Sequence, residues 1–291
     1  MKPSHLYIFF LLSLIGCSTT EEVDIKLNPP KLVINSLFSP DNTWQVSITN
    51  TVNIVDDPKY YHFFPPITTA LVTLYDQSNN PLETLNFSHN TRSYHGTTVP
   101  EYGEQYTLQV KVNNENSLQA ISTVPQQVPI ISVEVDSSSF KSQGEDIEMN
   151  VTFKDPAQVE NYYLIKIVRY SYDVRNRDTV RSIQNVYYEP VDPAFQNDFF
   201  NGNGSLINDR LFDGKTFSFR LKTRTYYYGS TTMVNLVLLA ISKEYYEYFT
   251  SQSLQQSSGD DPFAQPAIVY SNFENGVGIF AGYSSSIIRI D

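Results

Sequence analysis

Residues 106–112 read Tyr-Thr-Leu-Gln-Val-Lys-Val, and this strict alternation of apolar and polar side chains decides the fold class. Successive side chains of a β-strand point to opposite faces, so the segment predicts a strand with one buried and one solvated face. The same period of two recurs at 44–49, 131–135, 147–153 and 217–221. We therefore expect a mainly β protein whose sheets have one face in water.

The alternating segments fall into two groups along the chain. Between residues 31 and 124, turn-forming residues separate roughly seven short strands, which is typical of an immunoglobulin-like or transthyretin-like β-sandwich. The next segment, 125–129, contains Pro125 and Pro129. Neither proline can donate a hydrogen bond to a sheet, so the segment predicts an extended linker. Residues 130–291 are expected to form a second β-rich domain.

This second domain contains the one helix that we expect. Residues 233–241 are nearly all apolar, as expected for a strand that is covered on both faces. Ser242 can cap a helix that begins at Lys243 and ends near Gln256, because its hydroxyl can accept a hydrogen bond from the first turn. The helix would cover the sheet that residues 233–241 enter. Its apolar face would carry Tyr245, Tyr248 and Phe249.

Residues 1–16 have the features of a secretory signal peptide. Lys2 gives a positive start, and residues 6–12 are an apolar run that is too short for a transmembrane helix, which needs roughly 20 apolar residues. Gly16 and Cys17 match the small residue and the thiol that a lipoprotein signal peptidase requires. Cys17 is also the only cysteine of the chain, so it lacks a disulfide partner. We expect lipidation at Cys17; the alternative is an ordinary signal peptide with a chance cysteine.

Residues 17–30 are expected to form a lipidated tether. The tether contains the acidic run 19–24. In Bacteroidota, such a run after the lipidated cysteine resembles the signal that sends lipoproteins to the outer face of the outer membrane, although a plain solvated tether would look the same. Ser18 gives no indication of retention in the inner membrane. We therefore expect a protein that is anchored in outer-membrane lipid through Cys17 and faces the cell surface.

The charge balance excludes one class of partner. The chain has 20 Lys and Arg against 31 Asp and Glu, a formal charge of −11, and removal of Lys2 with the signal peptide makes it one unit more negative. Nucleic-acid binding relies on Lys and Arg that neutralise phosphates, and the arginines here are scattered. No nucleic-acid partner is expected. No second apolar segment of membrane-spanning length follows the signal peptide, so we expect a soluble body held at one end.

No catalytic or metal-binding pattern stands out, so we expect a protein that is not an enzyme and has no cofactor. Beyond the signal peptide the histidines are His62, His89 and His95, without a Gly-x-Ser-x-Gly motif, a second cysteine or a zinc-type spacing. The Asn/Asp/Gly-rich loop 201–214 has the oxygen ligands that calcium prefers. Asn-Gly and Asp-Gly are also common hairpin turns, and turns are the favoured interpretation of this loop.

Two aromatic clusters outside the helix are candidates for contact with a ligand or a partner. Tyrosine has an apolar ring and a polar tip, so exposed tyrosines suit recognition of a sugar, a peptide or a protein. Ordinary packing within a sheet is the favoured alternative. The candidate contact residues are Tyr60, Tyr61, Phe63, Tyr226, Tyr227 and Tyr228.

The C-terminal part carries three recognisable motifs, which are Ser242–Tyr246, Pro262–Pro266 and Ser271–Gly282. With the segment Lys31–Asn35 and the strand Ala70–Tyr75, they resemble the Bacteroidota outer-membrane lipoprotein family known only as domain of unknown function 4249. The resemblance covers nearly the whole mature chain. No functional residues are established for that family, so none is transferred here.

The resemblance implies a role in transport. Family members are typically encoded beside a TonB-dependent receptor, so a TonB-dependent receptor is the expected partner. We expect a non-enzymatic accessory or ligand-binding partner of such a receptor in nutrient uptake, with an unknown small ligand. The alternative is a structural or adhesive envelope lipoprotein that binds other surface proteins or matrix.

Overall fold

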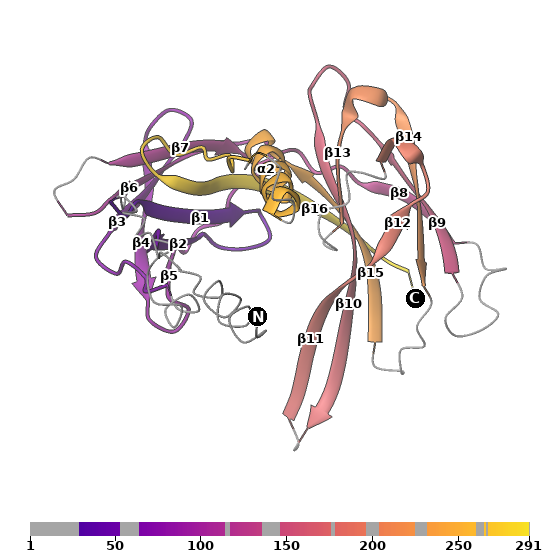
Figure 1. The fold of residues 1–291 in the computed structure, drawn as a ribbon, viewed down its shortest axis with the longest axis horizontal. Helices are drawn as coiled ribbons and strands as arrows, with labels where there is room; N and C mark the ends of the chain where they lie inside the picture. Colours follow the sequence, from indigo (N-terminus) through magenta and orange to yellow (C-terminus); the bar gives the residue numbers. More distant parts are fainter. Residues whose placement is uncertain are drawn as a thin grey trace, which may run out of the picture.

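The structure is a computed structural model, and it describes residues 29–52, 64–113, 117–135, 146–175, 178–195, 204–224, 232–259, 265 and 267–290. These residues form a mainly β protein with one α-helix, which confirms the predicted fold class. Two sandwich-like halves lie side by side, and the helix lies where they meet (Figure 1).

The first half is built from seven consecutive strands and part of the last strand of the chain. Neighbouring strands pair in the order β16-β1-β2-β5-β4-β3-β6-β7. The first seven are β1 (Leu32–Phe38), β2 (Gln45–Asn50), β3 (Leu71–Tyr75), β4 (Pro81–Ser88), β5 (Ser93–His95), β6 (Gln105–Lys111) and β7 (Leu118–Thr123).

One apolar core fills this half. In β6 the side chains of Tyr106, Leu108 and Val110 are buried and the intervening residues are more exposed, as the alternation predicts. Trp44, the only tryptophan of the chain, lies in the same core with 1% of its surface exposed. Its ring centroid is 5.0 Å from that of Phe38. Trp44 is therefore a natural fluorescent reporter of this core.

The second half contains two facing sheets. A four-stranded sheet has the order β12-β14-β9-β8, and the opposite sheet continues from β16 through β15 and β10 to β11, with β13 also paired to β10. Apolar side chains of both sheets form a second core. The strands are β8 (Ile130–Val135), β9 (Asp146–Lys154), β10 (Tyr162–Arg175), β11 (Asp178–Val186), β12 (Tyr188–Pro190), β13 (Ser205–Asn208), β14 (Thr216–Arg224) and β15 (Thr232–Ile241), with short 3-10 turns at Pro193–Phe195 and Asp209–Leu211.

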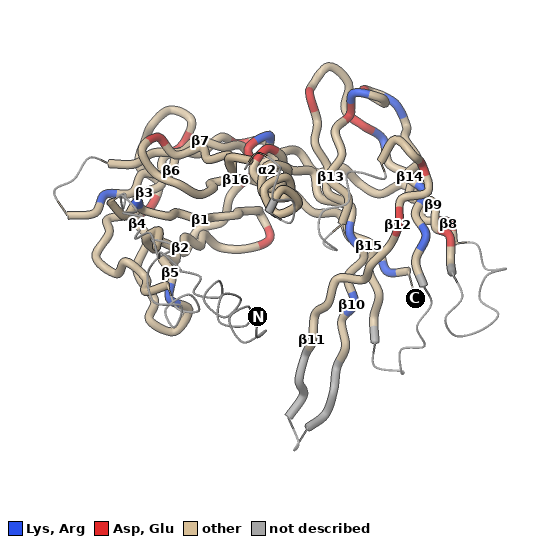
Figure 2. The backbone as a smooth tube through the Cα atoms, viewed as in Figure 1, with Lys and Arg blue, Asp and Glu red and all other residues tan. Residues whose placement is uncertain are grey.

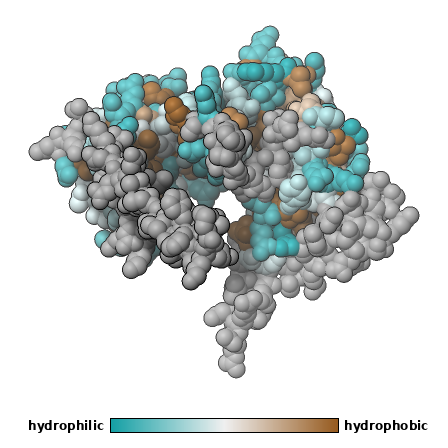
Figure 3. Space-filling model, viewed as in Figure 1, coloured by the Kyte–Doolittle hydropathy of each residue, from teal (hydrophilic) through white to brown (hydrophobic). Residues whose placement is uncertain are grey.

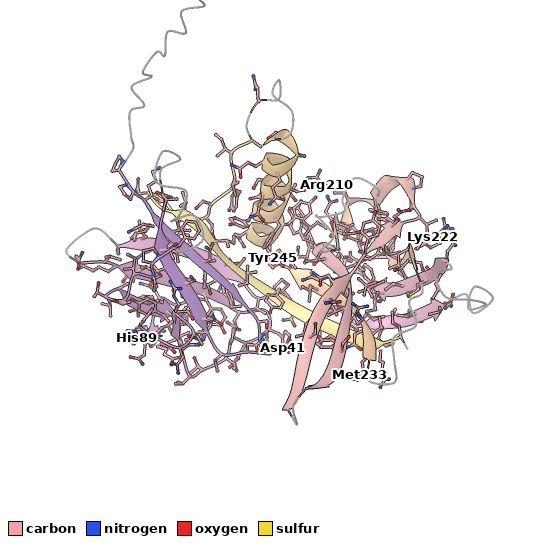
Figure 4. The ribbon with its side chains drawn as sticks, turned by 60° about the horizontal axis from the view of Figure 1, so that its bottom comes forward. Asp41, His89, Arg210, Lys222, Met233 and Tyr245 are labelled. Atoms are coloured by element: carbon pink, nitrogen blue, oxygen red, sulfur yellow. The ribbon has the colours of Figure 1, made fainter. Side chains whose placement is uncertain are left out.

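Strand β15 and the helix that follows it agree with the sequence prediction. Alternate residues of β15 belong to the second core and to a third cluster beneath the helix, so both faces of the strand are covered. Helix α2 (Lys243–Gly259) begins after Ser242, whose Oγ accepts a hydrogen bond from the Tyr245 amide at 3.3 Å. Tyr245 is buried against the sheet (Figure 4). The predicted helix is confirmed, and it ends at Gly259 rather than near Gln256.

Strand β16 (Val277–Arg289) belongs to both halves. Its residues 277–282 pair in parallel with β1, and its residues 283–289 pair antiparallel with β15. Phe280 is fully buried in the first core, 4.4 Å from Phe38 between ring centroids. The first part of β16, which lies within the predicted second domain 130–291, completes the sheet of the first half.

Two glycines let β16 approach its neighbours closely. Gly278 has φ +122°, and a Cβ there would overlap the carbonyl oxygen of Ile34 in β1. A Cβ on Gly282 would lie 2.8 Å from the carbonyl carbon of Thr123, because the curled sheet brings the end of β7 against β16. These glycines belong to the C-terminal motif, so that motif has a structural role.

A polar network fixes the two halves at this junction. The Ser122 hydroxyl donates to Glu244 Oε2 at 2.8 Å and lies 3.1 Å from Ser242 Oγ, while the Gly282 amide donates to Ser122 Oγ at 3.3 Å. Ser285 donates to the carboxylate of Asp41 at 2.5 Å, close to where the halves meet in Figure 4. Strand β7, strand β16 and the start of α2 are therefore held by one set of hydrogen bonds.

Candidate functional site

The strongest candidate site is a groove on the outer face of β1 and β2. Because side chains alternate along a strand, the residues between the core-facing ones point outward here. The two strands pair so that Asn35 lies opposite Ser47 and Val33 lies opposite Thr49. The residues of β1 and β2 that line the groove are Val33, Asn35, Ser36, Leu37, Gln45, Ser47, Thr49 and Asn50.

Two walls rise from this floor. On one side α2 contributes Tyr248, Phe249 and Gln252, and the two aromatic rings lie 5.2 Å apart between centroids. The other wall includes Phe64 and Arg92. The Arg92 guanidinium donates to the carbonyl oxygen of Phe64 at 3.0 Å, which holds this wall together.

The groove consists of two adjoining hollows that share Asn35 and Ser47. The hollow toward Arg92 has a volume of about 560 Å³, and the hollow beneath α2 has a volume of about 300 Å³. Both volumes fall in the range of roughly 300–1,000 Å³ that is common for ligand sites. Both hollows are open to solvent, so the groove suits an extended ligand better than a small enclosed one.

The groove carries almost no charge, although the chain as a whole is acidic. Strands β1 and β2 contain no charged residue and are tan along their length in Figure 2. Among the described residues that line the hollows, Arg92 alone is charged. The side chains of Asn35, Ser47 and Thr49 make no hydrogen bond to another described residue, so their polar atoms are available to a ligand. Figure 3 shows hydrophilic and smaller hydrophobic areas interspersed over the coloured part of the molecular surface.

The contact residues proposed from the sequence lie outside the described residues. This holds for Cys17, for Tyr60, Tyr61 and Phe63, and for Tyr226, Tyr227 and Tyr228. Phe64, which follows Phe63 in the chain, is described, is 45% exposed and lines the groove. The groove was missed because the polar residues of an alternating strand are typical of a plain solvated face. An available signal was the lack of any charge in residues 32–38 and 45–50.

A second feature is a group of three carboxylates at one end of the second half. Oxygens of Asp155, Asp209 and Asp213 lie within 4.8 Å of one another, a ligand set that could hold a divalent cation. Asp209 and Asp213 come from the described part of loop 201–214. Their carboxylates also accept hydrogen bonds from the backbone amides of Asn161, at 2.7 Å, and Gln158, at 3.1 Å. These bonds organise the turns, so an acidic cluster with backbone partners accounts for the geometry without an ion.

Asp155 is the most deeply placed of the three. It is 1% exposed, and it accepts hydrogen bonds from the Tyr163 hydroxyl at 2.5 Å and the Gly214 amide at 2.8 Å. Burial raises the pKa of the Asp155 carboxyl, with a smaller raising contribution from the charges of Asp209 and Asp213, while the two hydrogen bonds lower it. The Asp155 carboxyl therefore binds a proton more readily in the folded protein than in the unfolded chain.

The raised pKa of Asp155 predicts a pH-dependent effect of substitution. A carboxyl whose pKa is higher in the folded state than in the unfolded state stabilises the fold fully at any pH below its unfolded-state pKa. This contribution to the free energy of unfolding is lost as the pH rises through the folded-state pKa. Asp155→Asn removes this titration, so the melting temperature of the variant minus that of the wild type should increase as pH rises above about 4, the usual pKa of an aspartate, by roughly 2–4 °C for each kcal/mol. Thermal unfolding at several pH values measures this difference.

Asp76 provides a control, because its contribution to stability should change with pH in the opposite direction to that of Asp155. Hydrogen bonds from the side chain and backbone of Asn80 lower the pKa of Asp76, so its contribution is present at neutral pH and is lost on acidification. Asp76→Asn should lower the melting temperature more at pH 7 than at pH 3. The same pH trend in both variants would contradict the assignment for Asp155.

The described histidines form no complete hydrolytic site. His95 Nε2 lies 2.6 Å from Thr91 Oγ1 and 2.9 Å from Ser93 Oγ. Ser93 is only 2% exposed, so its hydroxyl cannot meet a substrate, and no described carboxylate bonds the second ring nitrogen of His95. The His89 ring packs edge-on against Phe87 at 5.1 Å. His62 lies outside the described residues.

Comparisons with known proteins identify a family. A family model described as domain of unknown function, DUF4249, matches residues 19–289. No curated protein matches this chain. A mutant form of Salmonella alpha-2-macroglobulin is 10% identical, with 76% of this chain covered and a TM-score of 0.23; the match spans only 14% of that protein. The mu-homology domain of yeast delta-COP-I, complexed with a Dsl1 peptide, is 12% identical over 89% of this chain and 94% of that chain, with a TM-score of 0.17.

Among the described residues, no helix is long and apolar enough to cross a membrane.

Proposed function

This chain belongs to the DUF4249 family, and we propose that it is a lipid-anchored, cell-surface lipoprotein that binds a ligand without enzymatic chemistry and serves a TonB-dependent receptor of the outer membrane as an accessory. The observation that carries the proposal is the groove on the outer face of β1 and β2, whose described lining residues include only one charged side chain, that of Arg92. An open groove with free amide and hydroxyl groups and aromatic walls is suited to binding, while the described histidines and carboxylates lack the arrangement of a hydrolase.

The position of the groove in the chain fits an anchored binding protein. Strand β1, which forms half of its floor, begins at Leu32, directly after the predicted tether 17–30. Lipid attached at Cys17 would therefore keep the groove within the reach of this tether, at most about 50 Å from the membrane surface when the tether is fully extended. A ligand captured there would be concentrated near a receptor in the same membrane, which raises its effective concentration at the receptor entrance.

A mild-detergent pull-down from native outer membranes tests the receptor partnership. The tagged, lipidated protein is extracted and the bound proteins are identified by mass spectrometry. We expect a TonB-dependent receptor in stoichiometric amount. Recovery of the lipoprotein alone, at detergent concentrations that preserve a known outer-membrane complex from the same cells, would contradict the accessory role.

Replacement of the predicted lipidation site tests the anchor. Cys17→Ser removes the thiol that would carry the lipid, and bacterial lipoproteins depend on acyl chains that contribute roughly 0.8 kcal/mol per buried CH₂. The variant should incorporate no labelled palmitate and should disappear from the outer-membrane fraction, whereas Ser18→Ala should behave like the wild type. Full palmitate labelling of Cys17→Ser would exclude lipidation at this residue.

One observation favours the alternative role in adhesion. The β10–β11 hairpin projects beyond the rest of the second half (Figure 1), and β11 pairs only with β10 among the described strands. Its Ile183 is 58% exposed. An edge strand of this kind can pair with another protein. Loss of cell adhesion in a deletion strain, with ligand uptake unchanged, would support this alternative over the accessory role.

A further inference from the structure

We propose that the groove on β1 and β2 binds a neutral oligosaccharide. This inference rests on the proposed function and deepens it, because it names the chemical class of the ligand. The groove, its lining residues and its lack of charge carry the argument, and none of the aromatic residues outside the described part of the chain is needed for it.

The scarcity of charge among the described lining residues favours an uncharged ligand. A charged ligand loses hydration on binding and needs an opposite charge in the site to compensate. The described lining residues include no carboxylate to pair with a cation, and an anion would meet a single guanidinium, that of Arg92, which also donates to the carbonyl of Phe64. The net negative charge of the chain also disfavours acidic ligands at a distance.

The free polar groups match the hydroxyls of a sugar. Amide and hydroxyl side chains can both donate and accept, as sugar hydroxyls do. Asn35 and Ser47 lie opposite each other across β1 and β2, and Thr49 follows on the same face of β2. On one face of a strand, side chains repeat about every 7 Å, so the floor offers a row of hydrogen-bonding groups to a ligand with repeating hydroxyls.

The aromatic wall supplies the apolar part of sugar recognition. One face of a pyranose ring presents mainly C–H groups, whose partial positive charge is attracted to the electron-rich face of an aromatic ring. Tyr248 and Phe249 of α2 form one wall of the groove, and Phe64 lies on the opposite wall. A chain of several sugar units could contact both walls while its hydroxyls meet the floor.

The pairing of β1 argues against an extended peptide as the ligand. Peptides that add a strand to a sheet need an unpaired edge. Strand β1 is paired with β16 on one side and with β2 on the other. The groove therefore offers side chains rather than backbone groups, which suits a sugar and leaves a peptide without its main source of affinity.

Binding of defined oligosaccharides tests the proposal. The lipidated protein in mild detergent is screened on an array of neutral oligosaccharides, acidic uronate oligosaccharides and mixed-sequence decapeptides, and the best binder is then titrated by calorimetry. We expect binding of a neutral oligosaccharide, with no binding of uronate oligomers. Binding of only peptides or only acidic glycans, or no binding of any neutral oligosaccharide at millimolar concentration, would overturn the proposal.

Substitutions in the groove locate the binding. Asn35→Ala should weaken the affinity about threefold to tenfold, the loss expected for one hydrogen bond. Tyr248→Ala should weaken it roughly tenfold, whereas Tyr248→Phe, which keeps the ring and the packing, should stay within about threefold. Asn86→Ala is the matched control, because Asn86 is an exposed asparagine on β4 outside both hollows.

The two proposals fail in different ways. Neutral glycan binding that is unchanged in Asn35→Ala and Tyr248→Ala would place the sugar elsewhere and overturn the groove assignment. A receptor in the pull-down without any glycan binding would overturn the ligand class and leave the accessory role in place. Glycan binding that depends on Asn35 without a receptor would support this inference and contradict the receptor partnership alone.

Discussion

Replacing Gly278 with valine should prevent the chain from reaching its native fold. Gly278 has φ +122°, a conformation that side chains other than glycine rarely adopt, and a Cβ there would overlap the Ile34 carbonyl oxygen and lie 2.8 Å from its carbonyl carbon. Ile34 lies in β1, which is held between β16 and β2 and cannot move away. The clash would expel β16 from both halves, so we expect the loss of most of the roughly 5–15 kcal/mol that stabilises a typical domain.

Far-ultraviolet circular dichroism and the fluorescence of Trp44 measure this effect. Gly276→Ala is the control, because the nearest atom to a Cβ at Gly276 would be the end of the flexible Leu118 side chain at 3.0 Å, and the φ of Gly276 is not positive. The control should fold and lose about 1 kcal/mol or less. A well-folded Gly278→Val protein with a native Trp44 spectrum would show that β16 does not need this close approach to β1.

Much of the fold follows from local sequence patterns. The period of two places the strands and tells which residues face the core, as in β6, because a strand alternates its faces whatever its partner is. The apolar run of β15 and the cap at Ser242 place the buried strand and the helix. These features depend on interactions within a few residues, so they can be read without the tertiary structure.

The sharing of β16 could not be predicted in this way. Alternation specifies a strand but not the strand beside it, and β1 and β16 are more than 240 residues apart in sequence. Glycines such as Gly276 and Gly278 permit a sharp turn and a close approach of another backbone, but they do not say which backbone that is. The partners of Gly278 and Gly282, which are Ile34 and Thr123, come from distant parts of the chain, and only the folded structure identifies them.

The candidate site was harder to predict than the fold. The groove is formed by residues from β1, β2 and α2, which the sequence separates by about 200 positions. Each of Asn35, Ser47 and Gln252 is individually typical of a solvated surface. Residues 201–214 are rich in oxygen ligands in the sequence, but Asp155, which directly follows β9, joins Asp209 and Asp213 only in the folded chain.

Replacing Phe219 with alanine in the second half should destabilise the core around Trp44 in the first half. Phe219 is 1% exposed and packs 5.7 Å from Phe195 between ring centroids, so the substitution should cost about 3–5 kcal/mol. Because β16 and the hydrogen bonds of Ser122 join the two halves, we expect them to unfold in one cooperative transition. The transition reported by Trp44 fluorescence should therefore fall by roughly 10 °C.

The exposed Ile183 of the same half provides the control for this coupling. Ile183→Ala should shift the Trp44 transition by no more than about 1–2 °C, since exposed side chains contribute little to stability. Hydrogen exchange of amides in β9 and β14 reports the second half directly. If Phe219→Ala accelerated exchange there while the Trp44 transition stayed at its wild-type temperature, the halves would unfold independently. A joint decrease would mean that β16 transmits stability between the two cores, and the groove beside β16 would then be held by a single rigid framework.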